Sequence, residues 1–164
     1  LLVEPENDWN KYQSIICKPI SVAGAKRLKI LKRGWRSVIK KPSILFNEEK
    51  QNIKLHFDMH HGYGNLERAI DLLDVEDKSD FNNYVINNSI FNPHIMFIAK
   101  KDILNKWFSK LFPWLEKCEN QFGFDNLKGY DTKRLYAYLA ERYLSFWFKK
   151  YTVYKEHPWV FIDS

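Results

Sequence analysis

Residues 133–151, KRLYAYLAERYLSFWFKKY, decide the fold class more than any other segment of the chain. Apolar and aromatic residues dominate the stretch, and Glu141 and Arg142 are the charged residues within its apolar run. Asp131 stands just before it and belongs to the residue types that cap helices. The sequence therefore predicts a long helix over 133–151 whose apolar stripe faces the core.

Glu141 falls three residues after Tyr138, near that stripe, so we expect its carboxylate to be partly buried. A buried carboxylate needs a cationic partner, which Arg142 or an arginine one or two turns away, such as Arg134, can supply. Such a group can pin a helix in place, hold a substrate hydroxyl or act as a base, and the pattern leaves these roles open.

The segments around this helix alternate between strand and helix patterns. In the first half of the chain, the sequence predicts a strand over 13–17, a helix over 25–39 that Gly34 weakens, and a loop with a short extended piece over 43–52. It then predicts helices over 66–74, capped by Asn65, and over 80–88, capped by Ser79. A buried strand over 94–100, a long helix over 103–122 that Asp102 caps and Pro113 kinks or divides, and one or two strands in 152–162 are predicted for the second half. This order indicates an α/β class, and 164 residues are enough for a single domain with its own core.

The composition excludes some classes of protein. Hydrophobic residues are 45% and charged residues 28% of the chain, which is too apolar for a disordered protein, and no run approaches the roughly 20 residues of a transmembrane helix. Cys17 and Cys118 form neither a disulfide framework nor a CxxC motif, so we expect a reducing cytoplasm. The N-terminus shows no signal-peptide pattern, and its first residue, Leu1, suggests part of a longer chain.

The net charge of +6 is concentrated in residues 26–41, which hold eight Lys or Arg and no acid. This segment has three interpretations: a solvated face, a polyanion-binding site, or an amphipathic helix on an anionic membrane with Leu28, Leu31, Trp35 and Val38 facing lipid. A single Trp among aliphatic residues favours a membrane or a protein partner over nucleic acid. The pyrophosphate of a nucleotide-sugar is a further partner for these cations.

Residues 56–65, HFDMHHGYGN, hold three of the five histidines. His56 and His60 would share one face of a helix, as two metal ligands require, but glycines at 62 and 64 argue against a helix. The pattern favours a glycine-containing substrate-binding loop over a metal cage, with an ordinary hydrogen-bonded polar loop as the alternative. His94, at the mouth of the strand over 94–100, is either a ligand contact or a core histidine.

Four segments resemble, in order, the second part of a bacterial glycosyltransferase domain of capsule, exopolysaccharide and lipopolysaccharide O-antigen synthesis, a family long described as a domain of unknown function. They are HFDMHHGYGNLERAIDLL (56–73), FNPHIMFIAKKDIL (91–104), WFSKLFPWLEKCE (107–119) and YDTKRLYAYLAERYLSFWF (130–148). Some members of that family are galactofuranosyltransferases. The family's first strands and an HYRR-like motif have no counterpart here, and the basic segment is longer than the family pattern.

The resemblance implies a partial GT-A-like α/β fold, the helix-rich C-terminal portion of a domain whose N-terminal nucleotide-binding strands are missing. It implies sugar transfer from a nucleotide-sugar donor to a glycan or lipid-linked glycan acceptor, on or near the inner face of the bacterial cytoplasmic membrane and without nucleic acid. The catalytic residues it suggests are Asp58, as base, His60 and His61, and the substrate-binding residues are Tyr63, Asn92, His94, Glu141 and Arg142.

Such enzymes often hold Mn²⁺ or Mg²⁺ through a DxD motif, which this sequence lacks; DVED at 74–77 is the nearest match and is expected to be a helix end. We therefore expect any metal to be held mainly by residues outside the chain, or by the His and Asp side chains of residues 56–65. Two rival functions are a non-enzymatic module that binds membranes or polyanions, and a metal-dependent hydrolase or nuclease built on the histidines.

Overall fold

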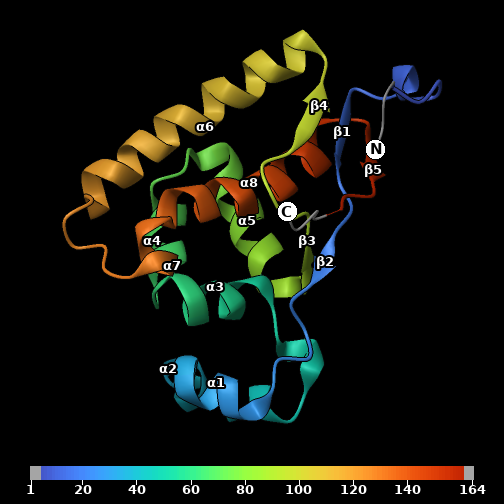
Figure 1. Cartoon of the computed structure of the whole chain (residues 1–164). Helices are drawn as coiled ribbons and strands as arrows, with labels where there is room; N and C mark the ends of the chain where they lie inside the picture. The colour runs from blue at the N-terminus through green and yellow to red at the C-terminus, as the bar shows by residue number, and fades with distance from the viewer. Residues whose placement is uncertain (1–4, 161–164) are drawn as a thin grey trace.

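The computed structural model describes residues 5–160, which form a mixed α/β fold that is mostly helical (Figure 1). Its helices are α1 (Arg27–Arg33), α2 (Trp35–Lys40), α3 (Ile53–His61), α4 (Asn65–Asp71), α5 (Val75–Asn87), α6 (Lys101–Phe122), α7 (Tyr130–Lys133) and α8 (Leu135–Tyr151). Its strands are β1 (Ser14–Cys17), β2 (Ile20–Ser21), β3 (Ile90–Phe91), β4 (Phe97–Ala99) and β5 (Tyr154–His157), and short 3-10 helices are η1 (Trp9–Lys11), η2 (Pro42–Leu45) and η3 (Glu48–Lys50).

Helix α8 is the centre of the core, because every residue from 139 to 148 is buried. Trp107 of α6 packs its ring against Tyr143 and Trp147 at centroid distances of 5.5 and 5.3 Å. Helix α5 lies beside α8 and supplies Phe81, whose ring meets Tyr143 at 5.4 Å (Figure 1). The predicted helix over 133–151 is confirmed from residue 135 onward. Asp131, the predicted cap, lies instead in the separate short helix α7.

A three-stranded sheet joins the two ends of the described chain. Its order is β4-β1-β5, with β1 antiparallel to β4 and parallel to β5, so that Ser14 pairs with both Ala99 and Tyr154. Strands β2 and β3 form a separate antiparallel pair, with Ile20 opposite Phe91. The strand expected at 13–17 is thus present, and the one or two strands expected in 152–162 are one strand, β5, with residues 161–162 lying outside the described residues. The β2–β3 pair holds the segment after residue 91 against α8.

The histidine-rich segment is a helix through residue 61, so the predicted loop is wrong for 56–61. Helix α3 begins because the Asn52 side chain accepts a hydrogen bond from the Leu55 amide at 2.9 Å. It ends at Gly62, whose φ of 100° is a conformation that few other residues adopt. The glycines therefore terminate the helix after the histidines and do not prevent it.

The predicted strand over 94–100 is shorter and less buried than expected. Only β4 is regular, and Ile98 on it is 56% exposed because β4 is an edge strand of the sheet. Helix α5 starts at Val75, after Asp74, so Ser79 lies inside it. Helix α6 continues through Pro113, which is exposed, so water can satisfy the carbonyl that the proline leaves unpaired.

Residues 42–50, where a short extended piece was expected, form the turns η2 and η3. Helix α4 starts one residue earlier than predicted, after Gly64, and the Asn65 side chain donates to the carbonyl of His61 at 2.9 Å instead of capping. Among the described residues, no helix is long and apolar enough to cross a membrane.

The basic segment forms two helices on the outside of the main core. Helices α1 and α2 meet at Gly34, which is buried, and a Cβ there would lie 3.1 Å from the Met59 side chain. A small second cluster attaches them to α3; its buried members are Ile30, Ile44, Leu55 and Met59. The predicted helix over 25–39 is therefore two helices.

Buried Asp77 ties α5 to α8. Its carboxylate accepts hydrogen bonds from the hydroxyls of Tyr143 at 2.6 Å and Tyr151 at 2.7 Å, and from the Lys150 ammonium at 2.9 Å. Burial alone would raise the pKa of Asp77, but these bonds outweigh it and hold the pKa below its ordinary value. Asp77 is thus an ionised anchor at the edge of the core.

We expect Asp77→Asn to lower the free energy of unfolding by about 2–3 kcal/mol, because a neutral amide replaces the acceptor of three hydrogen bonds. Urea denaturation followed by circular dichroism measures this change. Asp80→Asn is the matched control: Asp80 also pairs with Lys150, but its side chain is 57% exposed, so the loss should stay below about 1 kcal/mol. Equal losses in both variants would contradict the anchor role.

Candidate functional site

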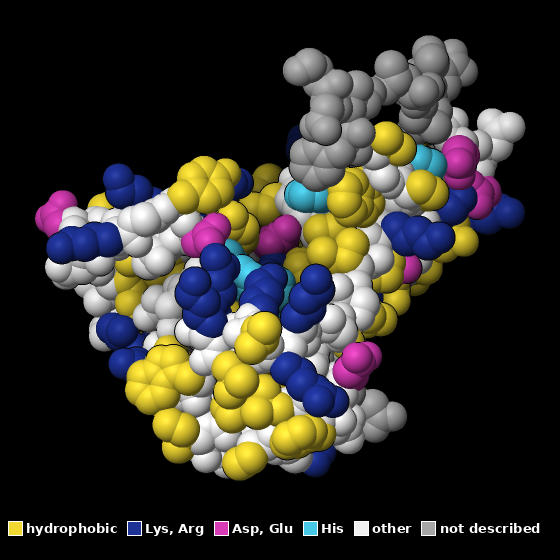
Figure 2. All heavy atoms as spheres, turned by 60° about the horizontal axis from the view of Figure 1, so that its bottom comes forward, with side chains coloured by type: hydrophobic (Ala, Val, Ile, Leu, Met, Phe, Trp, Pro, Cys, Tyr) yellow, Lys and Arg dark blue, Asp and Glu magenta, His cyan; other side chains and the backbone are white. Residues whose placement is uncertain are grey.

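A cavity of about 320 Å³ lies between α3, α8 and the segment that joins β3 to β4. Figure 2 shows histidine side chains in this hollow, surrounded by Lys, Arg and acidic side chains. The residues that line this histidine cavity are Ile20, His56, His60, His61, Phe91, Pro93, His94, Asp131, Tyr138, Glu141, Arg142 and Trp159. An adjoining hollow of about 390 Å³ shares His94, Tyr138 and Glu141 with it and adds Arg134. Both volumes are in the range of small-molecule sites.

Helix α3 brings three imidazoles to the cavity. The rings of His56 and His60, four residues apart, lie 4.5 Å from each other. His60 Nδ1 donates to the carbonyl oxygen of His56 at 2.8 Å, and His61 Nδ1 donates to that of Asp131 at 3.2 Å. Because Nδ1 carries the proton, the Nε2 atom of each neutral ring is the one that can accept a proton.

Helix α8 contributes a buried ion pair. Arg142 is 2% exposed, and its Nη1 donates to the Glu141 carboxylate. The sequence offered Arg142 or Arg134 as the cationic partner of Glu141, and Arg142 is the one that pairs with it. Its Nη2 lies 3.4 Å from His56 Nδ1, and its guanidinium carbon lies 3.6 Å from the centre of the Phe91 ring. Arg142 Nε is buried and has no hydrogen-bond partner among the described residues. This nitrogen is thus an unsatisfied donor within the described core and is not open to a ligand in the cavity.

Glu141 also fixes the backbone at His94. The other carboxylate oxygen accepts a hydrogen bond from the His94 amide at 2.5 Å. His94 has a φ of 64°, in the left-handed region that residues with a side chain adopt rarely. Such strain persists where surrounding contacts enforce it, and it is common at functional sites.

The histidines of α3 are neutral at physiological pH. Burial, followed by the charge of Arg142, lowers the pKa of His56 to about 3 and that of His61 to about 4. Burial also lowers the pKa of His60, although its bond to the carbonyl of His56 opposes this. His60 is half-buried, so it is a neutral imidazole that solvent or a ligand can reach.

Positive charge surrounds the neutral histidines. Lys29 and Arg33 of α1 are close enough to lower the pKa of His60, and Arg134 lines the adjoining hollow. Together with buried Arg142, these groups give the cavity a cationic rim and floor. The arrangement suits an anionic ligand with oxygen acceptors, such as a phosphate or diphosphate.

Two residues expected at the site lie elsewhere. Asp58 is buried on another side of α3, where it accepts hydrogen bonds from Lys54 Nζ at 2.9 Å and from the Gly64 amide at 3.0 Å. The Tyr63 ring lies between 5.5 and 5.7 Å from cationic groups of Arg36, Lys40 and Lys54. Neither residue lines the histidine cavity, whereas His60, His61, His94, Glu141 and Arg142 all do.

Asn92 lies next to the cavity but is fully buried. Its Nδ2 donates to the carbonyl of Cys17 at 2.6 Å, and its Oδ1 accepts from Ser145 Oγ at 2.7 Å. These bonds join β1, the segment after β3, and α8. The structure therefore gives Asn92 a role in holding the wall of the cavity, in place of direct substrate contact.

Seven cavity residues were missed as site residues from the sequence: Ile20, His56, Phe91, Pro93, Asp131, Tyr138 and Trp159. Tyr138 stacks on His61 with a centroid distance of 3.8 Å and an interplanar angle of 22°. The HxxxH spacing placed His56 beside His60, but only on the assumption of a helix. Nothing in the sequence around Trp159 indicated its contact with His94, where the rings meet edge to face at 4.6 Å.

The described residues hold no group of three or more His, Cys, Asp or Glu arranged to bind a metal. Mg²⁺ and Mn²⁺ prefer oxygen ligands, and two carboxylate residues line the cavity, Glu141 and Asp131. Glu141 is already bound to Arg142 and the His94 amide, which leaves Asp131 as a single carboxylate among imidazoles. The residues present do not fit either ion.

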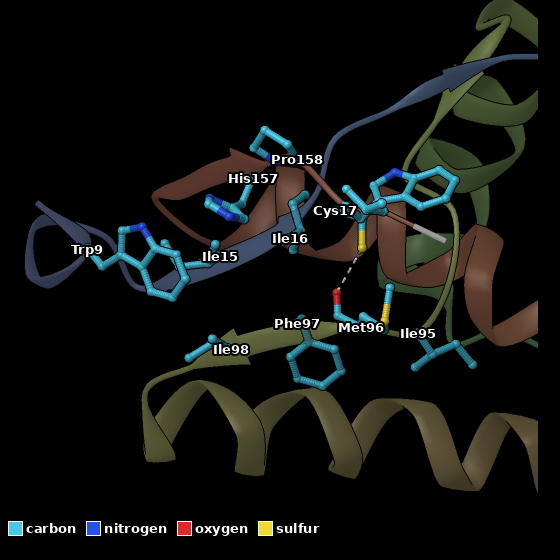
Figure 3. Close-up of a pocket in the computed structure, with 12 residues that line it drawn as sticks. Trp9, Ile15, Ile16, Cys17, Ile95, Met96, Phe97, Ile98, His157 and Pro158 are labelled. Carbon is cyan, nitrogen blue, oxygen red and sulfur yellow. Dashed lines mark hydrogen bonds between the residues drawn. The ribbon is translucent and has the colours of Figure 1, made fainter. Parts of the chain in front are cut away.

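A larger, apolar groove of about 730 Å³ adjoins the site, over β1 and β4 (Figure 3). It shares Trp159 with the histidine cavity. The Cys17 thiol lies in the groove and donates to the carbonyl of Met96 at 3.5 Å, and burial raises its pKa, so it is a protonated thiol and no nucleophile. The groove offers apolar contact area next to the polar cavity.

A family model described as "Domain of unknown function (DUF4422)" matches residues 20–152, which is most of the chain. The matched range includes every residue that lines the histidine cavity except Trp159. No curated protein and no solved structure matches the chain.

The lowered pKa values predict that His56 and His61 stay neutral at mildly acidic pH. An NMR titration of the imidazole carbons should show both rings unprotonated down to about pH 5, while the same residues titrate near 6.5 in urea. Between these pH values the unfolded chain binds more protons than the folded one, so the free energy of unfolding falls as the pH drops below about 6.5. Folded-state midpoints near 6.5 for both rings would contradict the buried, cation-facing site.

Proposed function

The chain belongs to the DUF4422 family, and we propose that it acts as a glycosyltransferase with a partial GT-A-like fold. It moves a sugar, with galactofuranose as the first candidate, from a nucleotide-diphosphate donor to a growing bacterial surface polysaccharide. The acceptor is a glycan or a lipid-linked glycan, and the reaction takes place on the cytoplasmic side of the membrane. The proposal rests on the motif resemblance and on the chemistry of the histidine cavity.

The observation that carries the proposal is buried Arg142 beside neutral imidazoles. Sugar transfer from such a donor needs positive charge where the nucleoside diphosphate departs and a base at the acceptor hydroxyl. Arg142, Arg134, Lys29 and Arg33 supply positive charge around one cavity. The α3 histidines supply uncharged nitrogen bases at the same place.

We assign the base role to His60 in preference to Asp58. The Asp58 carboxylate is bound to Lys54 and the Gly64 amide, away from the cavity. His60 lines the cavity, and its bond to the carbonyl of His56 leaves Nε2 as the basic nitrogen. His60 is also the less buried of the two histidines whose Nδ1 atoms are held by carbonyls, so its nitrogen is the easier one for a substrate to reach.

In the proposed step, the acceptor oxygen forms a bond to the anomeric carbon of the donor sugar while the bond from that carbon to the diphosphate oxygen breaks. The acceptor hydroxyl gives its proton to His60 Nε2. The diphosphate leaves with the bonding electron pair, and Arg142 and the surrounding cations stabilise its charge. Glu141 positions both Arg142 and the His94 backbone.

His60→Gln should reduce the release of UDP from UDP-galactofuranose or UDP-galactose by about 100-fold or more, because general-base catalysis contributes on that scale. Arg142→Lys keeps the charge but loses the planar fork of donors, so it should mainly weaken donor binding. A coupled assay for UDP release measures both effects, with the folded fraction of each variant checked by circular dichroism.

Asp58→Asn serves as the comparison within the same helix. If the transfer is abolished by Asp58→Asn and unaffected by His60→Gln, the assignment of the base is wrong. The assay is run on this chain and on a form extended upstream to an initiating Met, which would supply the nucleotide-binding strands that the resemblance implies. If no nucleotide-sugar supports UDP release by the extended form, with or without Mg²⁺ and a glycan acceptor, the proposed reaction is contradicted.

A further inference from the structure

We propose that the basic lobe, defined as residues 26–46 with α1, α2 and η2, is a docking surface for an anionic lipid bilayer. The lobe lies at one end of the molecule, at the bottom of Figure 1. Figure 2 shows hydrophobic side chains gathered over this region, with Lys and Arg side chains between them and the histidines. This inference is independent of the proposed transferase activity.

The lobe exposes large apolar side chains in a regular pattern. Leu28, Trp35 and Ile39 are 80%, 51% and 69% exposed. They recur, with Leu31, at spacings of three or four residues along α1 and α2, and Phe46 at the end of the lobe is 74% exposed. Solitary exposed apolar residues are ordinary, but several on one small lobe mark an interaction surface.

These apolar side chains are exposed although the lobe itself is firmly packed on the rest of the protein. The opposite side of α1 buries Ile30 completely, against Ile44, Leu55 and Met59. Gly34 also allows close packing against Met59, since a Cβ at this position would lie 3.1 Å from the Met59 side chain. The lobe is therefore packed on α3 through one side and presents the other side to its surroundings.

The charge of the lobe identifies the partner as anionic. Residues 26–41 hold eight Lys or Arg and no acid, and all eight are exposed. The Arg27 guanidinium lies 5.3 Å from the centre of the Phe46 ring, and that of Arg36 lies 5.3 Å from that of Trp35. Each pair combines an aromatic ring with a cation, which is the combination found at the headgroup level of bilayers.

Aliphatic side chains distinguish a bilayer from nucleic acid. A nucleic acid would use the cations and could stack a base on Trp35, but it offers no apolar medium for Leu28 and Ile39. A bilayer uses both features, because apolar side chains enter the acyl boundary while cations meet anionic headgroups. The lobe also carries Lys29 and Arg33, so docking would keep the histidine cavity near the headgroups.

Vesicle sedimentation tests the docking surface directly. The unaltered chain should bind vesicles of phosphatidylcholine with 30% phosphatidylglycerol and should bind pure phosphatidylcholine at least about tenfold more weakly. Brominated acyl chains should quench tryptophan fluorescence, and Trp35→Phe should remove most of that quenching.

Two sets of variants separate the apolar and the electrostatic parts. Leu28→Ser with Ile39→Ser should lower the vesicle partition coefficient about tenfold or more, and so should Arg27→Gln with Lys32→Gln and Lys41→Gln. The matched controls are Val75→Ser with Val153→Ser, which are 91% and 60% exposed elsewhere, and Lys101→Gln with Lys106→Gln and Lys128→Gln. All of these side chains are exposed, so the variants should fold, and the controls should bind like the unaltered chain.

Three outcomes would overturn the proposal. The first is no binding to anionic vesicles at low ionic strength. The second is vesicle binding that depends on the cations but not on Leu28, Trp35 and Ile39. The third is duplex DNA binding, measured by fluorescence anisotropy, that is tighter than vesicle binding and lost in the same charge variants, because this would identify the lobe as a polyanion site.

Discussion

A buried guanidinium organises this molecule. Arg142 lies in the middle of a helix that is surrounded by protein, so its charge must be balanced inside the core. Glu141 provides the opposite charge, Phe91 provides a ring face, and His56 stays neutral beside it. Through Glu141 the pair also holds the unusual backbone of His94. The arrangement of α3, α8 and the β3–β4 segment follows from satisfying one charge.

Burial and the same charge together shape the chemistry of the site. Burial, followed by the charge of Arg142, lowers the pKa values of His56 and His61, so these imidazoles stay neutral at physiological pH. Arg142 Nε remains without a hydrogen-bond partner among the described residues, so the buried charge is balanced mainly through Glu141. The DUF4422 domain covers almost all of this cavity, so the site belongs to the family domain itself.

Apolar periodicity in the sequence was enough to predict the two longest helices and two of the strands. Helices α6 and α8 and strands β1 and β5 follow from apolar spacing and residue type, and the Glu141–Arg142 pair follows from its place in the apolar run. Gly62 and Gly64 predicted a loop over the histidines, whereas the Asn52 side chain caps a helix that ends only at Gly62. In a helix, residue 58 points about 200° away from residues 56 and 60, so Asp58 does not share a face with His56 and His60.

The sequence did not predict which distant residues come together at the site. His94 and Trp159 reach the cavity only through strand pairing and the packing of distant segments, which leave no local signal. The exposed side chains of the basic lobe have helical spacing, which is equally typical of a buried face. Only the structure shows that Ile30 takes the buried side and leaves Leu28, Trp35 and Ile39 outside.

A crystal structure of the chain with UDP would locate the ligand without relying on turnover. We expect electron density for the diphosphate in the histidine cavity or its adjoining hollow, within hydrogen-bond distance of Arg142 or Arg134. Density for UDP at another place, such as the apolar groove over β1 and β4 or the basic lobe, would contradict this expectation.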